Sequence, residues 1–237
     1  MVIKKLISLV QRIIYGYEAD VLTFSQAGED LLIRNFFYPK IVAREKGVFI
    51  DIGAFHPYKH SNTYYLYRLG WRGINIDPRP NSMKMFQKVR PKDKNMEVAI
   101  SDKRELLNYY FLGENSTMNS FSLEYIESIG QKSNVKQVIP INTIPLSEVI
   151  DQNFPKGTVI DFMNIDVEGL DINVLRSNNW SKYRPTLIAI EISANSLEAI
   201  LNTETATFLI ENEYEFYSRI PLSAQYVNTV FFVDSRK

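Results

Sequence analysis

Residues 47–77 read GVFIDIGAFHPYKHSNTYYLYRLGWRGINID and predict a strand, a glycine turn, a helix and a second strand. The first apolar run ends in Asp51 and is followed by Gly53, and the second apolar run ends in Asp77. The two acids are 26 residues apart (77 − 51 = 26), near the roughly 20 typical of a dinucleotide-binding fold. A glycine turn that approaches a ligand closely and an acid that accepts hydrogen bonds from ribose hydroxyls both suit an adenosine-containing cofactor.

The composition of the turn argues against NAD. Only Gly53 remains of the triple-glycine pattern that accommodates a pyrophosphate, and Phe55, His56 and Pro57 fill the rest of the turn. The pattern therefore favours a cofactor that has an adenosine but no phosphates, with S-adenosylmethionine (SAM) as the leading candidate. An ordinary strand–helix–strand unit with polar strand ends is the alternative interpretation.

The composition indicates one globular domain over residues 1–237. Lysine plus arginine and aspartate plus glutamate both number 27, so the balance of charge gives no case for a nucleic-acid partner. The chain has no cysteine, which excludes disulfides and thiolate metal sites and agrees with a cytoplasmic location.

The first 40 residues are expected to form a helical extension. Apolar residues from 3 to 17 follow a helical spacing, with Lys4, Lys5 and Arg12 among them. The segment is too short and too charged to span a bilayer, and it lacks the cleavage site of a signal peptide. Such a helix packs on its own domain, on a second subunit of a homo-oligomer, or on a membrane surface as a peripheral contact.

Strands and helices alternate along the rest of the chain, which predicts a mainly parallel sheet covered on both faces. The last two strands have no helix between them and predict an antiparallel hairpin. The expected helices span 25–38 (with Ser25 as N-cap and Pro39 as its end), 61–69, 81–89, 145–150, 169–175 and 196–212. The expected strands span 47–52, 72–77, 96–101, 107–112, 135–144, 159–166, 186–192, 214–220 and 226–233.

The chain resembles the FkbM-type SAM-dependent methyltransferases over roughly residues 24–200. The matching motifs are SQAGED at 25–30, FIDIGAFHP at 49–57, SNTYYLY at 61–67, GWRGINIDPRP at 70–80, RP at 90–91, AISD at 99–102 and DFMNIDVEGLDINVL at 161–175. The resemblance implies the Rossmann-like, seven-stranded sheet of class I methyltransferases. It also implies methylation of hydroxyl groups, often on sugars of polysaccharide, capsule or natural-product pathways. The sequence departs from the family at Phe55–Pro57, where the glycine turn commonly reads DIGAN-x-G.

Five residues are expected around the adenosine and amino end of SAM. Asp51 is expected to hold the methionine amino group, Gly53 to let the backbone approach the ligand, and Asp77 to bind the ribose hydroxyls. Ser101 and Asp102 end the third strand and are expected to meet the adenine. Capping of strand ends is the structural alternative for all of them.

Four further residues are candidates for the amino-acid end of the cofactor. The resemblance implies that Gln26 and Glu29 border this end, whereas the residues alone indicate a helix-capping motif. Ser61 and Asn62 start the helix after the glycine turn, and a helix N-terminus suits the SAM carboxylate. Plain N-capping explains both residues equally well.

The chemistry is expected at Asp166 and Glu168, with His56 as a further catalytic candidate. Methyl transfer to an alcohol requires loss of the hydroxyl proton, which a general base assists. Alternatively, Asp166 and Glu191 bind Mg²⁺ or Mn²⁺, and the cation lowers the hydroxyl pKa. A structural role is the third interpretation, with Glu168 capping a helix, Glu191 holding a loop and His56 in a proline-bounded turn.

These observations predict a SAM-dependent O-methyltransferase that acts on the hydroxyl of a sugar, in a nucleotide-linked sugar or a surface polysaccharide. Two alternatives come from other classes. One is a non-catalytic scaffold domain that binds SAM or another adenosine ligand, and the other is an NAD-linked sugar oxidoreductase. The presence of Asp166 and Glu168 speaks against the first alternative, and the missing glycines speak against the second.

Overall fold

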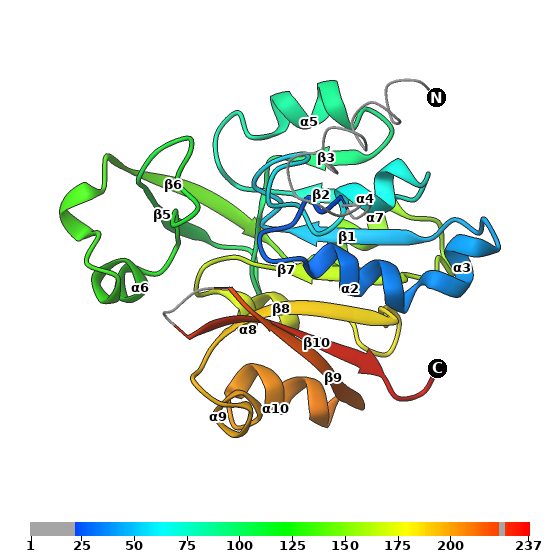
Figure 1. Cartoon of the computed structure of the whole chain (residues 1–237). Helices are drawn as coiled ribbons and strands as arrows, with labels where there is room; N and C mark the ends of the chain where they lie inside the picture. Colours follow the sequence, from blue (N-terminus) through cyan, green and yellow to red (C-terminus); the bar gives the residue numbers. More distant parts are fainter. Residues whose placement is uncertain (1–21, 223–225) are drawn as a thin grey trace, which may run out of the picture.

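A seven-stranded sheet forms the centre of the computed structural model, which describes residues 22–222 and 226–237 (Figure 1). In spatial order its strands are β3 (Lys94–Met96), β2 (Arg72–Ile76), β1 (Val48–Ile52), β7 (Phe162–Ile165), β8 (Leu187–Ser193), β10 (Val227–Asp234) and β9 (Tyr214–Pro221). The first five strands run parallel, and β10 is antiparallel to both β8 and β9. The predicted fold class, a mainly parallel sheet with a closing antiparallel hairpin, is therefore confirmed.

The strand register aligns the carboxyl ends of β1, β2 and β7. Ile52 of β1 pairs with Ile76 of β2 on one side and with Ile165 of β7 on the other. The residues that follow these strands therefore leave the sheet at the same edge. Asp77 and Asp166, which are far apart in the sequence, both begin their loops there.

Helices cover both faces of the sheet and enclose the two larger apolar cores of the described residues. One core lies between the sheet and Ile33, Phe37, Leu66 and Trp71 from the N-terminal helices and turns. The larger core packs the other face against apolar residues of α7, α8, α9 and α10. The helices are α2 (Glu29–Phe36), α3 (Tyr38–Val42), α4 (Tyr64–Arg68), α5 (Met83–Val89), α7 (Leu146–Asn153), α8 (Asp171–Arg176), α9 (Leu197–Leu201) and α10 (Glu204–Glu211).

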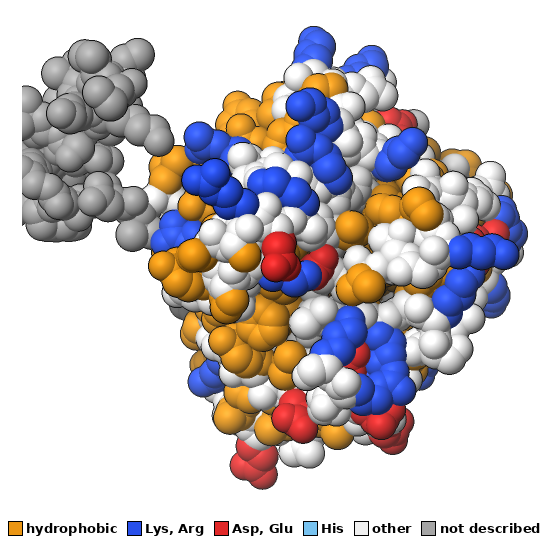
Figure 2. Space-filling view, turned by 90° about the vertical axis from the view of Figure 1, so that its right-hand side faces the viewer, with side chains coloured by type: hydrophobic (Ala, Val, Ile, Leu, Met, Phe, Trp, Pro, Cys, Tyr) orange, Lys and Arg blue, Asp and Glu red, His pale blue; other side chains and the backbone are white. Residues whose placement is uncertain are grey.

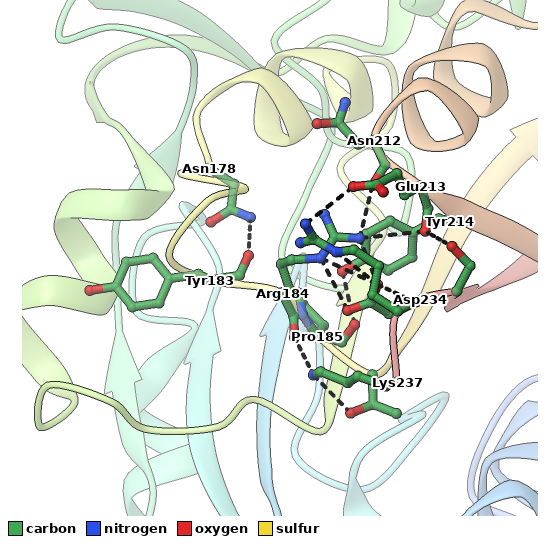
Figure 3. A network of polar contacts seen from close by, with 12 residues as sticks. Asn178, Tyr183, Arg184, Pro185, Asn212, Glu213, Tyr214, Asp234 and Lys237 are labelled. Atoms are coloured by element: carbon green, nitrogen blue, oxygen red, sulfur yellow. Dashed lines mark hydrogen bonds and ion pairs between the residues drawn. The ribbon is translucent and has the colours of Figure 1, made fainter.

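A polar cluster anchors the closing hairpin to the sheet (Figure 3). The Arg184 guanidinium donates to both carboxylate oxygens of Asp234, and it also donates to the carbonyl of Asn212 at 2.8 Å. It lies over the Tyr214 ring, 4.7 Å from the centroid. Lys237 donates to the carbonyl of Arg184 at 2.6 Å. The loop before β8 and both ends of the hairpin are thereby joined at the end of the sheet where β8 begins.

A second, smaller sheet with one helix projects from the main sheet, and we call it the lobe (Figure 1). Its strands lie in the order β4 (Ala99–Ile100), β6 (Gln137–Ile144) and β5 (Leu106–Phe111), and α6 (Leu123–Ser128) lies between β5 and β6 in the chain. The sequence predicted the strands but not α6. A 3₁₀ turn, Lys132–Asn134, follows α6.

Three of the predicted elements are divided or displaced in the structure. The expected strand 96–101 is divided, because the chain leaves the main sheet after Met96 and Ala99 pairs with Thr143 of the lobe. The expected helix 196–212 is also divided, because the Thr203 hydroxyl accepts from Ala206 N and starts a new helix. The first helix begins at Glu29 rather than after Ser25, and its partner α3 carries Pro39 in its first turn.

The N-terminal prediction of an amphipathic helix over residues 3–17 lies outside the described residues. Within residues 22–222 and 226–237, no helix is both long and apolar enough to cross a membrane. Figure 2 shows the end of the molecule that carries α3, where lysine and arginine side chains are scattered among hydrophobic ones. Tyr38 and Val42 of α3 are among the exposed hydrophobic residues of the chain.

Candidate functional site

A pocket of about 650 Å³ lies where the carboxyl ends of the parallel strands face the lobe. Eight of the predicted site residues line it, and they are Gln26, Asp51, Gly53, Asn62, Asp77, Asp166, Glu168 and Glu191. The other five, which do not line it, are Glu29, His56, Ser61, Ser101 and Asp102. The strand-end acids that the sequence singled out on β1, β2, β7 and β8 therefore meet in one cavity.

The glycine turn after β1 is compressed against the end of β7. Gly53 has a φ of 81°, and a Cβ atom built there would lie 1.6 Å from the carbonyl oxygen of Asp166. Its backbone N–H donates to Ile76 O at 2.9 Å, so the turn is held between β2 and β7. From the sequence, Gly53 is expected to let the backbone approach a ligand closely. The structure adds a direct reason, because any side chain here would separate the two strand ends.

Asp77 is held at the end of β2 by the turns on either side of it. Its Oδ2 accepts from Phe55 N at 3.0 Å and its Oδ1 from Arg79 N at 2.8 Å. Arg79 also donates to the carbonyls of Phe55 and Glu114, which connects the turn to the lobe. Burial raises the pKa of Asp77, and the Arg79 charge and the two N–H groups oppose this rise. The carboxylate is therefore oriented before any ligand arrives.

Asp51 lies in a buried polar network and is only 2% exposed. Thr63 Oγ1 donates to its Oδ2 at 2.5 Å, and Asn164 Nδ2 donates to its Oδ1 at 3.0 Å. Asn62 Nδ2 in turn donates to Asn164 Oδ1 at 2.9 Å. Ser61 is buried outside the pocket, where its hydroxyl accepts from Tyr64 N at the start of α4. The structure thus places Asn62 at the pocket and gives Ser61 a capping contact.

Asp166, Glu168 and Glu191 form the most acidic part of the pocket, and we call them the acid cluster. Each of them offers a carboxylate oxygen, and these atoms all lie within 4.8 Å of one another. Glu168 has a φ of 53°, an uncommon conformation for a residue other than glycine. Its carbonyl accepts from the Ser120 hydroxyl of the lobe, so a contact across the pocket holds this turn.

Burial and mutual repulsion disfavour the ionised forms of the acid cluster. Burial, followed by the charges of Glu191 and Glu168, raises the pKa of Asp166 well above its usual range. Burial raises the pKa of Glu168 to about 7, although a hydrogen bond from the Tyr125 hydroxyl opposes the rise. Burial and the charge of Glu168 raise the pKa of Glu191 to about 8. Such values are typical of general bases and of sites that gain a cation or a cationic ligand.

Two predicted residues from the N-terminal motif have different positions. Gln26 lines the pocket, whereas the Glu29 carboxylate is buried behind it. Glu29 accepts from Ala27 N at 2.7 Å, and Thr229 Oγ1 lies 3.5 Å from its Oε1. Glu29 is close enough to Glu191 for its charge to contribute to the raised pKa of that residue.

The structure does not bring His56, Ser101 or Asp102 to the pocket wall. The Nδ1 atom of His56 accepts from the backbone N–H groups of Tyr58 and Lys59, so the ring closes its own turn. Ser101 and Asp102 lie past the wall because the chain turns into the lobe before reaching them. Val98, Ala99 and Ile100 line the pocket in their place.

Sequence reasoning missed the lobe side of the pocket. Its aromatic side chains are Tyr109, Phe121 and Tyr125, and polar residues of the loop 113–119 and of α6 lie beside them. One local signal was present, because Ser122 precedes an apolar run with helical spacing. In the structure the Ser122 hydroxyl accepts from Tyr125 N and caps α6.

Comparison with known families gives one match. Residues 51–216 of the 237 match the model of the methyltransferase FkbM domain. This range holds 166 residues (216 − 51 + 1 = 166), well over half of the chain. A search of curated proteins finds no match.

Several solved methyltransferase structures are similar at low identity. A TehB-like SAM-dependent methyltransferase from Corynebacterium glutamicum is 11% identical, with 98% of this chain and 97% of that chain covered and a TM-score of 0.41. Precorrin-6y C5,15-methyltransferase from Geobacter metallireducens is 11% identical, with coverages of 85% and 87% and a TM-score of 0.44. The N-terminal domain of human METTL16 in complex with SAH is 10% identical, with coverages of 98% and 80% and a TM-score of 0.41.

Proposed function

The chain belongs to the FkbM methyltransferase family and is therefore a SAM-dependent methyltransferase, and we propose that it methylates a hydroxyl group of a sugar. The observation that carries the proposal is the acid cluster in the pocket, between the strand ends and the lobe. A hydroxyl group becomes a good nucleophile as it loses its proton, and carboxylates with raised pKa values accept a proton near neutral pH.

The strand-end acids suggest how SAM is oriented. Asp77 accepts hydrogen bonds from the ribose hydroxyls, and Asp51 accepts from the methionine ammonium group. The adenine then lies toward Val98, Ala99 and Ile100. This orientation directs the sulfonium and its methyl group toward the acid cluster, where a positive charge favours the ionised form of the carboxyl groups.

In the reaction, the acceptor oxygen attacks the methyl carbon in line with the breaking carbon–sulfur bond. A new carbon–oxygen bond forms, SAH leaves, and the hydroxyl proton passes to Asp166 or Glu168. The acid cluster also has the donor chemistry that Mg²⁺ or Mn²⁺ prefers, namely several carboxylate oxygens close together. Asp166 and Glu191 would hold such an ion, and it would lower the pKa of the acceptor hydroxyl.

The lining of the pocket supports an uncharged sugar unit as the acceptor. Five carboxylates line the pocket against one arginine, and this charge disfavours a phosphate group inside it. Tyr109, Phe121 and Tyr125 supply aromatic faces, and Asn119 and Gln131 supply amide groups for hydroxyls. The phosphates of a nucleotide-linked sugar would therefore remain outside, as would the rest of a surface glycan.

We also propose a cytoplasmic reaction with a sugar or a nucleotide-linked sugar as the partner, and no nucleic acid. The balanced charge and the lack of cysteine support this setting. Self-association and a membrane contact through residues 3–17 stay predictions.

A methyl-transfer screen tests the proposed function. Purified protein is incubated with labelled SAM and a panel of nucleotide-linked sugars and neutral oligosaccharides, with and without a chelator, and Asp166→Asn serves as the control. Transfer to a sugar hydroxyl that Asp166→Asn abolishes supports the proposal. Loss of transfer with chelator and its return with Mg²⁺ or Mn²⁺ supports the metal role. A protein that binds SAM but methylates no member of the panel would favour the scaffold alternative.

A further inference from the structure

A fully buried arginine lies behind the amino-acid end of the proposed SAM site. Arg90, directly after α5, is 0% exposed, and its guanidinium carbon lies 5.1 Å from the Phe49 ring centroid, 5.3 Å from that of Tyr67 and 5.7 Å from that of Phe86. A buried charge is costly unless it is paired, and Arg90 Nε donates to Asp93 Oδ2 at 2.8 Å. The sequence singled out this arginine only as part of the RP motif at 90–91.

The scaffold holds this ion pair in place. Asp93 accepts from Gly73 N and from Asn75 Nδ2, both at 3.2 Å, so strand β2 determines its position. The ion pair with Asp93 occupies Arg90 Nε and leaves the Nη1 group of Arg90 for another partner. Arg90 Nη1 donates to Thr63 Oγ1 at 2.9 Å, toward the pocket side of the network.

Thr63 links this arginine to the pocket. Its oxygen accepts from Arg90, so its own proton is available for the Asp51 carboxylate, 2.5 Å away. Thr63 is fully buried, so water does not compete for these contacts. The second oxygen of Asp51 accepts from Asn164, whose amide orientation is determined by Asn62. Both oxygens of Asp51 are therefore fixed by buried hydrogen bonds. Arg90 and Thr63 fix one oxygen, and Asn62 and Asn164 fix the other.

We propose that Arg90 and Thr63 are positioning residues that hold Asp51 ready to accept the ammonium group of SAM. This inference rests on the proposed function only in requiring that SAM binds with its amino group at Asp51. A carboxylate has about four acceptor positions, and the two protein hydrogen bonds leave the others for a ligand. The Arg90 charge also opposes the rise that burial causes in the pKa of Asp51.

Comparing the binding of two ligands distinguishes a positioning role of Thr63 from a general effect on the fold. SAM carries the ammonium group, whereas methylthioadenosine has the same adenosine and a sulfur-bound methyl group but lacks both the amino-acid end and the positive charge of the sulfonium. Thr63→Val removes the hydroxyl and keeps the shape, and we expect it to weaken SAM binding by about tenfold or more, as for a lost hydrogen bond to a charged group. Methylthioadenosine affinity is expected to change less than about twofold. Isothermal calorimetry without an acceptor measures both.

Three further variants sharpen the test. Thr63→Ser keeps the hydroxyl and should restore most of the SAM affinity. Thr203→Val removes the hydroxyl cap of α10, far from the pocket, and should lower the melting temperature without changing the ratio of the two affinities. Arg90→Lys should weaken SAM selectively, and it should add little on the Thr63→Val background if Arg90 acts through Thr63.

The proposal is overturned if Thr63→Val binds SAM within about twofold of the wild type. It is also overturned if the variant loses SAM and methylthioadenosine affinity equally, because that result indicates a structural role. Additive effects of Arg90→Lys and Thr63→Val would exclude the step through Thr63. Since no acceptor is present, a failure to methylate sugars in the separate screen leaves these outcomes unaffected.

Discussion

The two walls of the pocket are built in different ways. On the sheet side, Asp51 and Asp77 are buried, and hydrogen bonds from neighbouring turns and side chains orient them. On the lobe side, aromatic and amide side chains come from a three-stranded sheet, a loop and a short helix inserted after β3. The register of the main sheet determines the first wall but not the second. We infer that the sheet wall serves the cofactor and that the lobe wall selects the acceptor.

The largest expected effect lies where the two walls meet. Asp166→Asn removes a proton acceptor and should lower turnover by about 10²- to 10⁴-fold while SAM still binds, because a general base contributes in this range. Single-turnover methyl transfer and calorimetric SAM binding measure the two quantities separately. Glu168→Gln serves as the companion variant. If both variants methylate the acceptor at the normal rate, neither Asp166 nor Glu168 acts as a base or as a metal ligand.

The second effect tests the sheet wall alone. Asp77→Ala should weaken SAM binding by at least about tenfold, because a hydrogen bond to a charged group typically contributes about 1.5–3 kcal/mol. Asp102→Ala is the matched control, since Asp102 is exposed and does not line the pocket. Calorimetry measures the affinities, and circular dichroism checks the fold. Unchanged affinity in Asp77→Ala would refute the ribose assignment.

The third effect tests the lobe wall. Phe121 packs against Tyr109 with ring centroids 4.8 Å apart, and both rings line the pocket. Phe121→Ala should raise the KM for the acceptor by about 2- to 10-fold, the usual range for losing one aromatic contact. The Kd for SAM should stay the same, and Phe121→Leu should give an intermediate KM. If SAM affinity falls and the acceptor KM does not, the assignment of the two walls is wrong.

The same contrast determines what the sequence could predict. Asp51, Asp77 and Asp166 could be predicted to meet in one pocket because parallel strands end at one edge, where an acid after a buried run is expected. Ser101 and Asp102 were misplaced because the chain leaves the main sheet after Met96 and pairs with β6 instead. No local sequence pattern predicts that the chain changes sheets here, since Ala99 and Ile100 continue the apolar run.

Residues of the lobe were missed for a related reason. Tyr109, Phe121 and Tyr125 reach the pocket because a strand, a loop and a helix fold back over the sheet edge, and this arrangement depends on tertiary contacts. One such contact is the bond from Ser120 to the carbonyl of Glu168. His56 lies off the pocket wall for a local reason, because its Nδ1 atom accepts from two N–H groups of its own turn.

The smallest expected effect concerns how much the ionisation of the acid cluster lowers the stability of the folded protein. Burial raises the pKa of Glu168 from 4.5 to about 7, so between these values the folded protein keeps a proton that the unfolded chain has lost. The free energy of unfolding therefore falls as the pH rises through this window. Glutamine does not ionise, so Glu168→Gln should raise the melting temperature by a few degrees at pH 8 and leave it almost unchanged near pH 4.5. Calorimetric melting at both pH values measures this, with Glu124→Gln on the exposed side of α6 as the control. An equal shift at both pH values would instead indicate a packing effect. A shift confined to high pH would show that ionisation of the buried Glu168 lowers the stability of the fold. Such a cost is expected of an acid that has a catalytic role.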